Sequence, residues 1–180
     1  MKQLTVFIGA LLLTISSFGQ DVKVPSNYQL KKVEDYGPYK DSVEIVAKWM
    51  VSNPLTKDRE VRGAANKFVL SWISGAPNTH IQINPEIANE VMKDKTNIYG
   101  TDLLMDYMAG MILVKLHNNE AEDPETQEAG IKAMLVGYES VVNFCTIKIL
   151  DILQKQKAKG TLAEWIKANA AKSETKAKKE

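Results

Sequence analysis

Residues 99–117 read YGTDLLMDYMAGMILVKLH and form the most apolar stretch of the chain outside its N-terminal leader. A helix that is apolar on nearly every side belongs in the middle of a packed domain. A membrane span needs about 20 mainly apolar residues, but only residues 107–114 separate Asp106 from Lys115. We therefore expect a buried helix in a domain with a sizeable core, and no insertion into a membrane.

The polar strip of this predicted helix passes through Asp102 and Asp106 and continues into Ala109 and Gly110. Two carboxylates four residues apart share one helix face. If both were buried, their charges would raise one pKa, as a general acid requires. The simpler interpretation is that the strip faces solvent or a neighbouring lysine or arginine.

The N-terminus has the pattern of an export signal. Lys2 precedes an apolar run over residues 4–15, and the small residues Ser17 and Gly19 stand where a signal peptidase cuts. We expect residues 1–19 to be a signal peptide and the mature protein to be exported to the periplasm or the medium. No cysteine stands at the predicted cleavage point, so we expect no lipid anchor there.

Charge and cysteine content argue against a nucleic-acid-binding protein and against a disulfide-stabilised one. Without Lys2 the chain has 22 basic and 22 acidic residues, which leaves no overall field to attract nucleic acid. Cys145 is the only cysteine, so no internal disulfide can form although an exported protein could have one. Stability must then come from packing.

The remaining pattern predicts one all-α domain, a helical bundle of five to six helices over residues 39–171. An extended N-terminal arm, residues 20–38, precedes it, and a charged, disordered tail, residues 172–180, follows it. Apolar spacing of three and four residues predicts helices near these ranges: 39–52, 58–74, 85–93, 99–118, 124–157 and from 162 onward.

The range 124–157 leaves two alternatives open. A heptad seam from Ile131 to Ile152 supports one long helix, which would approach 50 Å at roughly 1.5 Å per residue. That is long for this domain, so a kink near residues 143–146 is the other possibility.

Small residues mark two helices for close contact. Gly130, Ala133 and Gly137 form a groove on the helix that begins near residue 124. Each glycine costs a helix about 1 kcal/mol relative to alanine. Close approach of Ala109 and Gly110 would compensate for that cost.

Residues 77–85 read PNTHIQINP, in which Ile81 and Ile83 alternate with His80 and Gln82 as in a strand. No convincing partner strand is present, so the segment could pair weakly with residues 22–24, remain a surface loop, or pair with another molecule. The predicted binding residues are Asn78, Thr79, His80, Ile81, Gln82 and Ile83.

The sequence gives little support for metal binding or nucleophilic catalysis. His80 and His117 are the only histidines and neither has a second ligand at metal-binding spacing, so we expect no metal and no cofactor. No glycine-flanked serine elbow is present, and Cys145 lies on the apolar seam, where cysteine is usually inert. The tryptophans fall on or beside apolar faces and are expected in the core.

Two motifs support a resemblance. A leader ending in SFGQ and the run KDREVRGAANKF followed by WISGAP at residues 72–77 resemble small exported bacterial all-helical proteins without an assigned activity. The YMAG motif at residues 107–110 looks like the aromatic-small helix of exported immunity proteins that neutralise secreted toxins. Those proteins carry paired cysteines, whereas this chain has Cys145 alone.

We therefore expect an exported, non-enzymatic helical protein that contacts a protein partner in the cell envelope. The alternatives are a small envelope hydrolase or lyase that uses Asp102 and Asp106 as an acid–base pair, and a toxin-neutralising protein.

Overall fold

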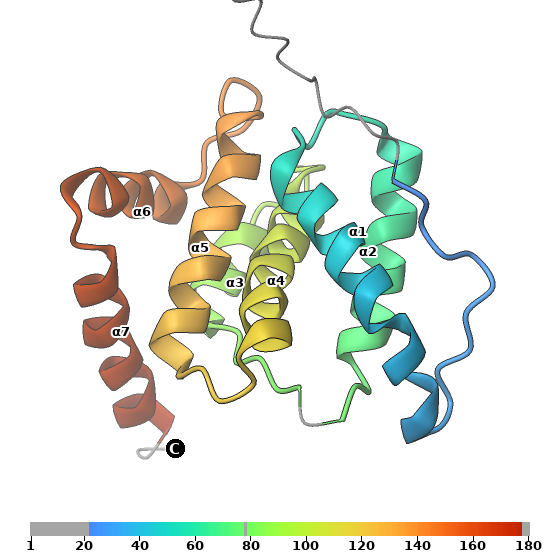
Figure 1. Ribbon diagram of the computed structural model, residues 1–180. Coiled ribbons are helices and arrows are strands. Elements are labelled where there is room, and N and C mark those ends of the chain that lie inside the picture. The colour runs from blue at the N-terminus through green and yellow to red at the C-terminus, as the bar shows by residue number, and fades with distance from the viewer. Residues whose placement is uncertain (1–21, 78, 178–180) are drawn as a thin grey trace, which may run out of the picture.

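The computed structural model describes residues 22–77 and 79–177; the predicted signal peptide and Asn78 lie outside these ranges. The described chain is all-helical and contains no strand, which confirms the all-α class. Its helices are α1 (Lys40–Ser52), α2 (Arg59–Ile73), α3 (Pro85–Met92), α4 (Gly100–His117), α5 (Asp123–Glu139), α6 (Lys148–Lys159) and α7 (Leu162–Ala177) (Figure 1). Two 3₁₀ turns, η1 (Val33–Asp35) and η2 (Gly37–Tyr39), precede α1.

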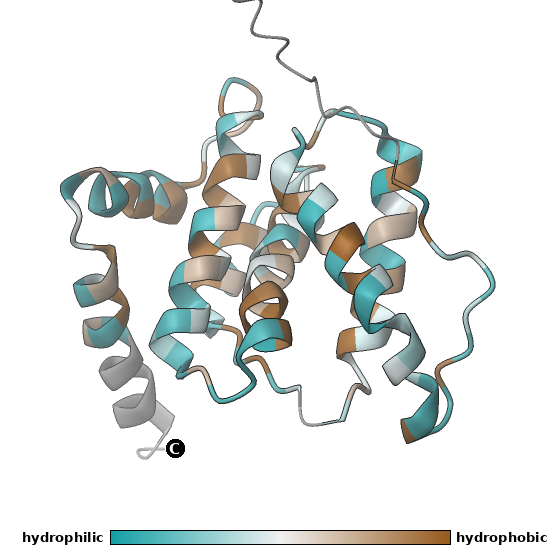
Figure 2. Cartoon of the chain, viewed as in Figure 1, coloured by the Kyte–Doolittle hydropathy of each residue, from teal (hydrophilic) through white to brown (hydrophobic). Residues whose placement is uncertain are grey.

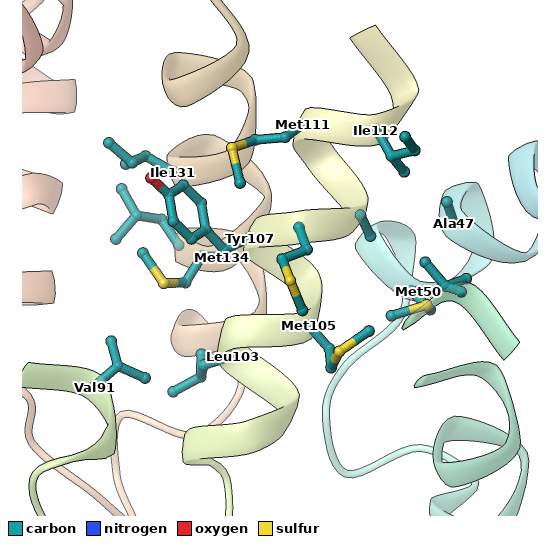
Figure 3. Close-up of a cluster of buried hydrophobic side chains, with 14 of the residues drawn as sticks. Ala47, Met50, Val91, Leu103, Met105, Tyr107, Met111, Ile112, Ile131 and Met134 are labelled. Carbon is teal, nitrogen blue, oxygen red and sulfur yellow. The ribbon is translucent and has the colours of Figure 1, made fainter. Parts of the chain in front are cut away.

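Helix α4 occupies the middle of the molecule, between α1 and α5 (Figure 1). Every residue from Met105 to Ile112 is buried. Tyr107 and Met111 point toward α5, and Ile112 points toward α1 (Figure 3). This matches the prediction of a buried helix, and no helix in residues 22–77 or 79–177 is long and apolar enough to cross a membrane.

Helices α4 and α5 touch through their small residues, as the glycine pattern predicts. A Cβ atom placed on Gly110 would lie 2.7 Å from the carbonyl oxygen of Ala129 and 2.9 Å from the Cα of Gly130. Gly137 has a different neighbour, because its added Cβ would meet the Asp106 carboxylate at 2.5 Å. Glycine is required at these positions for close packing and not for a special backbone angle.

The range 124–157 forms two helices, so one continuous helix is wrong and the alternative of an interruption near residues 143–146 is the better prediction. The described chain has seven helices, close to the predicted five to six. The Ser140 hydroxyl donates to the Gly137 carbonyl at 2.6 Å and accepts from the Leu55 amide at 3.0 Å, which ties the end of α5 to the link after α1. The Tyr138 hydroxyl accepts from the Ile147 amide at 3.0 Å at the start of α6. These bonds to distant segments hold the break.

The N-terminal arm contributes more to the core than its composition suggests. Tyr28 and Tyr36 are among its partly buried side chains, and the Trp72 indole donates to the Tyr36 carbonyl at 2.9 Å. Gly75 allows this docking, since a Cβ there would fall 2.0 Å from the Tyr36 hydroxyl oxygen. At the other end, α7 continues to Ala177, past Lys172, where the sequence predicts the disordered tail to begin.

Candidate functional site

The two predicted catalytic carboxylates are buried and each binds an arginine of α2. Asp102 accepts from Arg59 at 2.5 Å and from the Asn66 amide at 2.7 Å. Asp106 accepts from Arg62 at 2.9 Å, and both of these side chains are only 1% exposed. A neighbouring arginine therefore meets each carboxylate, as the simpler interpretation of the strip proposes.

Arg62 is the centre of this cluster. Its Nη2 donates to the carbonyl oxygens of Met50, at 3.1 Å, and Asn53, at 2.8 Å, so it satisfies acceptors at the C-terminal end of α1. Its guanidinium carbon also lies 5.4 Å from the centre of the Trp49 ring. One buried side chain thus joins α1, α2 and α4.

Burial is the main influence on the pKa of Asp106. Desolvation raises the pKa of this carboxyl to about 7, although the Arg62 charge and its hydrogen bond oppose the rise. One carboxylate with a raised pKa is what an acid–base pair requires. However, the Asp106 side chain is 1% exposed, so a substrate has no access to its oxygens in this conformation.

The predicted binding segment packs on its own domain. Ile81 and Ile83 are half-buried against the core, and the Gln127 side-chain amide donates to the Gln82 carbonyl. His80 and the Gln82 side chain are exposed. Because replacing either isoleucine would disturb packing, the exposed pair His80 and Gln82 provides the cleaner test of binding by this segment. Thr79 is half-buried beside it.

The histidines and the cysteine do not gather. His117 lies 3.2 Å from Glu44, and in the described ranges no group of three or more His, Cys, Asp or Glu residues is arranged to hold a metal ion. Cys145 is half-buried, and burial raises the pKa of its thiol, with a smaller effect from Asp94. A raised thiol pKa makes the cysteine a weaker nucleophile at neutral pH.

The break between α5 and α6 creates a surface that sequence reasoning missed. Phe144 is 73% exposed and Ile98, in the link before α4, is 69% exposed. Tyr99 lies beside Phe144, with ring centres 6.5 Å apart, and the Arg59 guanidinium carbon lies 5.5 Å from the centre of the Tyr99 ring. We call Ile98, Tyr99 and Phe144 the Ile98–Phe144 patch.

The patch adjoins a cavity of about 840 Å³ between the α3–α4 link and the α5–α6 link. Val91 and Ile147 contribute apolar lining, and Lys93 and Lys148 are among the charged residues around it. Within the described chain Lys93 pairs with Glu90 at 3.1 Å, whereas Lys148 has no ion pair. Phe144 stands beside Cys145 of the predicted seam, in the link over residues 140–147 where the helix is interrupted.

A second hollow, of about 680 Å³, lies between α1, α4 and α5. Gly110 and Ala133 line it, so the same small residues that let α4 and α5 touch also deepen this groove. The basic residues at its rim already have acidic partners: Lys48 bonds Glu44 and Lys132 bonds Glu128. This groove therefore offers apolar surface with little unpaired charge.

No protein-family model, curated protein or solved structure matches the chain.

Proposed function

We propose that this chain is an exported helical protein, a bundle stabilised by packing around α4, that acts by binding another protein and not by catalysis. The observation that carries the proposal is the Ile98–Phe144 patch. Large apolar side chains gathered at the surface mark contact sites more often than isolated ones do. The leader over residues 1–19 supports export, and a mass measurement of the mature chain tests its cleavage after Gly19.

The composition of the patch fits a protein surface. Aromatic residues, methionine and arginine are enriched at the centres of protein interfaces, and Tyr99, Phe144 and Arg59 lie together here. The exposed Met92 side chain precedes the α3–α4 link. The patch lies on the α3–α4 link and the α5–α6 link, and such links carry recognition more often than the centres of helices do.

The charges next to the patch indicate the partner's chemistry. Lys148, which lines the cavity, is exposed and has no ion pair within the described residues, and the same holds for Lys95 in the α3–α4 link. The carboxylates in the lining already have partners, because Glu90 pairs with Lys93 and Asp94 accepts from the Thr96 hydroxyl. The partner that fits is a protein segment with an apolar side chain for the cavity and an acidic residue beside it. The extended segment over residues 79–83 would be a second, weaker contact, made through His80 and Gln82.

The carboxylate-enzyme alternative would require Asp106 to reach a substrate, whereas Asp106 is 1% exposed and bonded to Arg62. Its release from that pair would have to accompany binding. A toxin-neutralising role would be one form of the proposed protein binding, and the identity of the captured partner would distinguish it.

Site-specific photo-crosslinking in the producing cell tests the proposal. A photoreactive phenylalanine analogue at position 144 should give one dominant protein adduct, whereas the same group at Val33, which is 65% exposed, should not. With the purified partner, Phe144→Asp should weaken binding by about 30-fold or more, as expected for an interface hot spot. Val33→Asp is the matched control and should bind as the parent does.

Equal crosslinking from positions 144 and 33, or unchanged partner affinity for Phe144→Asp, would exclude the patch as the binding site. Since Phe144 is largely exposed, the variant should keep the thermal stability of the parent, and that measurement separates lost binding from lost folding.

A further inference from the structure

Although the overall charge is balanced, basic and acidic residues are unevenly distributed along the chain. Residues 148–180 contain nine lysines and four acidic residues, while the part before them is correspondingly acidic. This basic part includes α6 and α7, which lie together at one edge of the molecule (Figure 1). A local field of one sign attracts charged partners even where the net charge is near zero.

Several of these lysines are not used within the fold. Lys155 and Lys159 are exposed and four residues apart, so they project from the same side of α6. Lys167 is exposed on α7. None of the three forms an ion pair with the described side chains, those of residues 22–77 and 79–169, whereas Lys157 pairs with Glu139 at 3.6 Å.

The surface around them lacks the features of other binding sites. None of the large exposed apolar side chains of the described chain lies on α6 or α7, and α6 is hydrophilic along much of its length (Figure 2). Protein interfaces are built around apolar and aromatic anchors, and single-stranded nucleic acid is held by exposed aromatic rings. The two arginines of the sequence, Arg59 and Arg62, are both on α2, so the surface of α6 and α7 has no arginine.

We propose that the exposed side of α6 and α7, with Lys155, Lys159 and Lys167, binds anionic lipid headgroups at a membrane surface. Clusters of lysines on a helix are attracted to such surfaces without inserting into them. The sequence contains four further lysines after Lys167. Contact of this kind would hold an exported protein at the envelope, and it is separate from the Ile98–Phe144 patch.

Vesicle flotation of the full mature chain tests the proposal. The chain should bind phosphatidylcholine vesicles that contain phosphatidylglycerol, lose binding at high salt, and ignore vesicles of phosphatidylcholine alone. Each lysine near an anionic surface is worth about a fivefold change in binding. The triple variant Lys155→Gln, Lys159→Gln, Lys167→Gln should therefore bind roughly a hundredfold more weakly.

A matched control replaces three other exposed lysines, Lys31, Lys40 and Lys67, with glutamine and changes the net charge equally. Equal losses in the two triple variants, equal binding to both vesicle types, or tighter binding to a single-stranded oligonucleotide would each overturn the proposal. Lys148 is left unchanged in both variants because it lines the cavity beside the Ile98–Phe144 patch. Failure here therefore leaves the proposed protein binding untouched.

Discussion

Replacing Gly110 with alanine adds one methyl group where α4 and α5 touch. The three nearest atoms to the new Cβ would be the Ala129 carbonyl oxygen at 2.7 Å, the Ala133 Cβ at 2.7 Å and the Gly130 Cα at 2.9 Å. All three are backbone atoms or the first side-chain atom, so none can turn away on a flexible side chain. The two helices would have to separate.

The magnitude follows from two opposing effects. Overpacking costs about 1–3 kcal/mol, and the rigid neighbours of Gly110 place this case at the upper end, near 3 kcal/mol. Alanine recovers about 1 kcal/mol of helix propensity. We expect Gly110→Ala to lower the free energy of unfolding by about 2 kcal/mol, or the melting temperature by about 4–8 °C.

Urea and thermal unfolding followed by circular dichroism measure this change. Gly63→Ala is the matched control, because Gly63 lies within α2 and a Cβ there would meet nothing within 4 Å. This control should gain stability by about 0.5–1 kcal/mol. If Gly110→Ala also proved as stable as the parent or more stable, α4 and α5 would not approach as closely as described, and the packing argument would fail.

Three further changes test the buried polar groups by the same unfolding measurements. Arg62→Met should lower the free energy of unfolding by about 3–5 kcal/mol, because it leaves Asp106 buried without its partner. The double variant Arg62→Met, Asp106→Asn should lose less than the sum of the two single losses. A loss equal to or greater than that sum would argue against the pair. Since burial raises the pKa of Asp106 from 3.8 to about 7, the folded state binds more protons than the unfolded state between those values, and stability should fall as pH rises through this window, by at most about 4 kcal/mol. Asp106→Asn should flatten that dependence, and an unchanged slope would assign it to another group. Tyr138→Phe removes the hydroxyl that donates to Asp151 and accepts from the Ile147 amide, so it should cost about 1–3 kcal/mol, and a neutral result would mean that this bond does not hold the start of α6.

The candidate sites show where prediction from sequence stopped. Asp102 and Asp106 can be recognised as a pair from their spacing on an apolar helix. Their partners Arg59 and Arg62 are 43 and 44 residues away and lie on the polar side of an amphipathic helix, where arginine usually faces water. Only the contact of α2 with α4 turns Arg62 inward, where it is fully buried.

Local sequence by itself determined the all-α class, the burial of α4, the start of α3 at Asn84 and Pro85, and the closeness of Gly110 to Gly130. These features depend on spacing, capping and residue size, which neighbours along the chain define. Tertiary structure decided the break after α5. The seam from Ile131 to Ile152 favours a continuous helix, but bonds from Leu55 and Ile147 to residues at the end of α5 outweigh it. Phe144 lies in that break and is exposed. A helix boundary that depends on hydrogen bonds between distant segments has no signal in local periodicity, so only the tertiary structure places it.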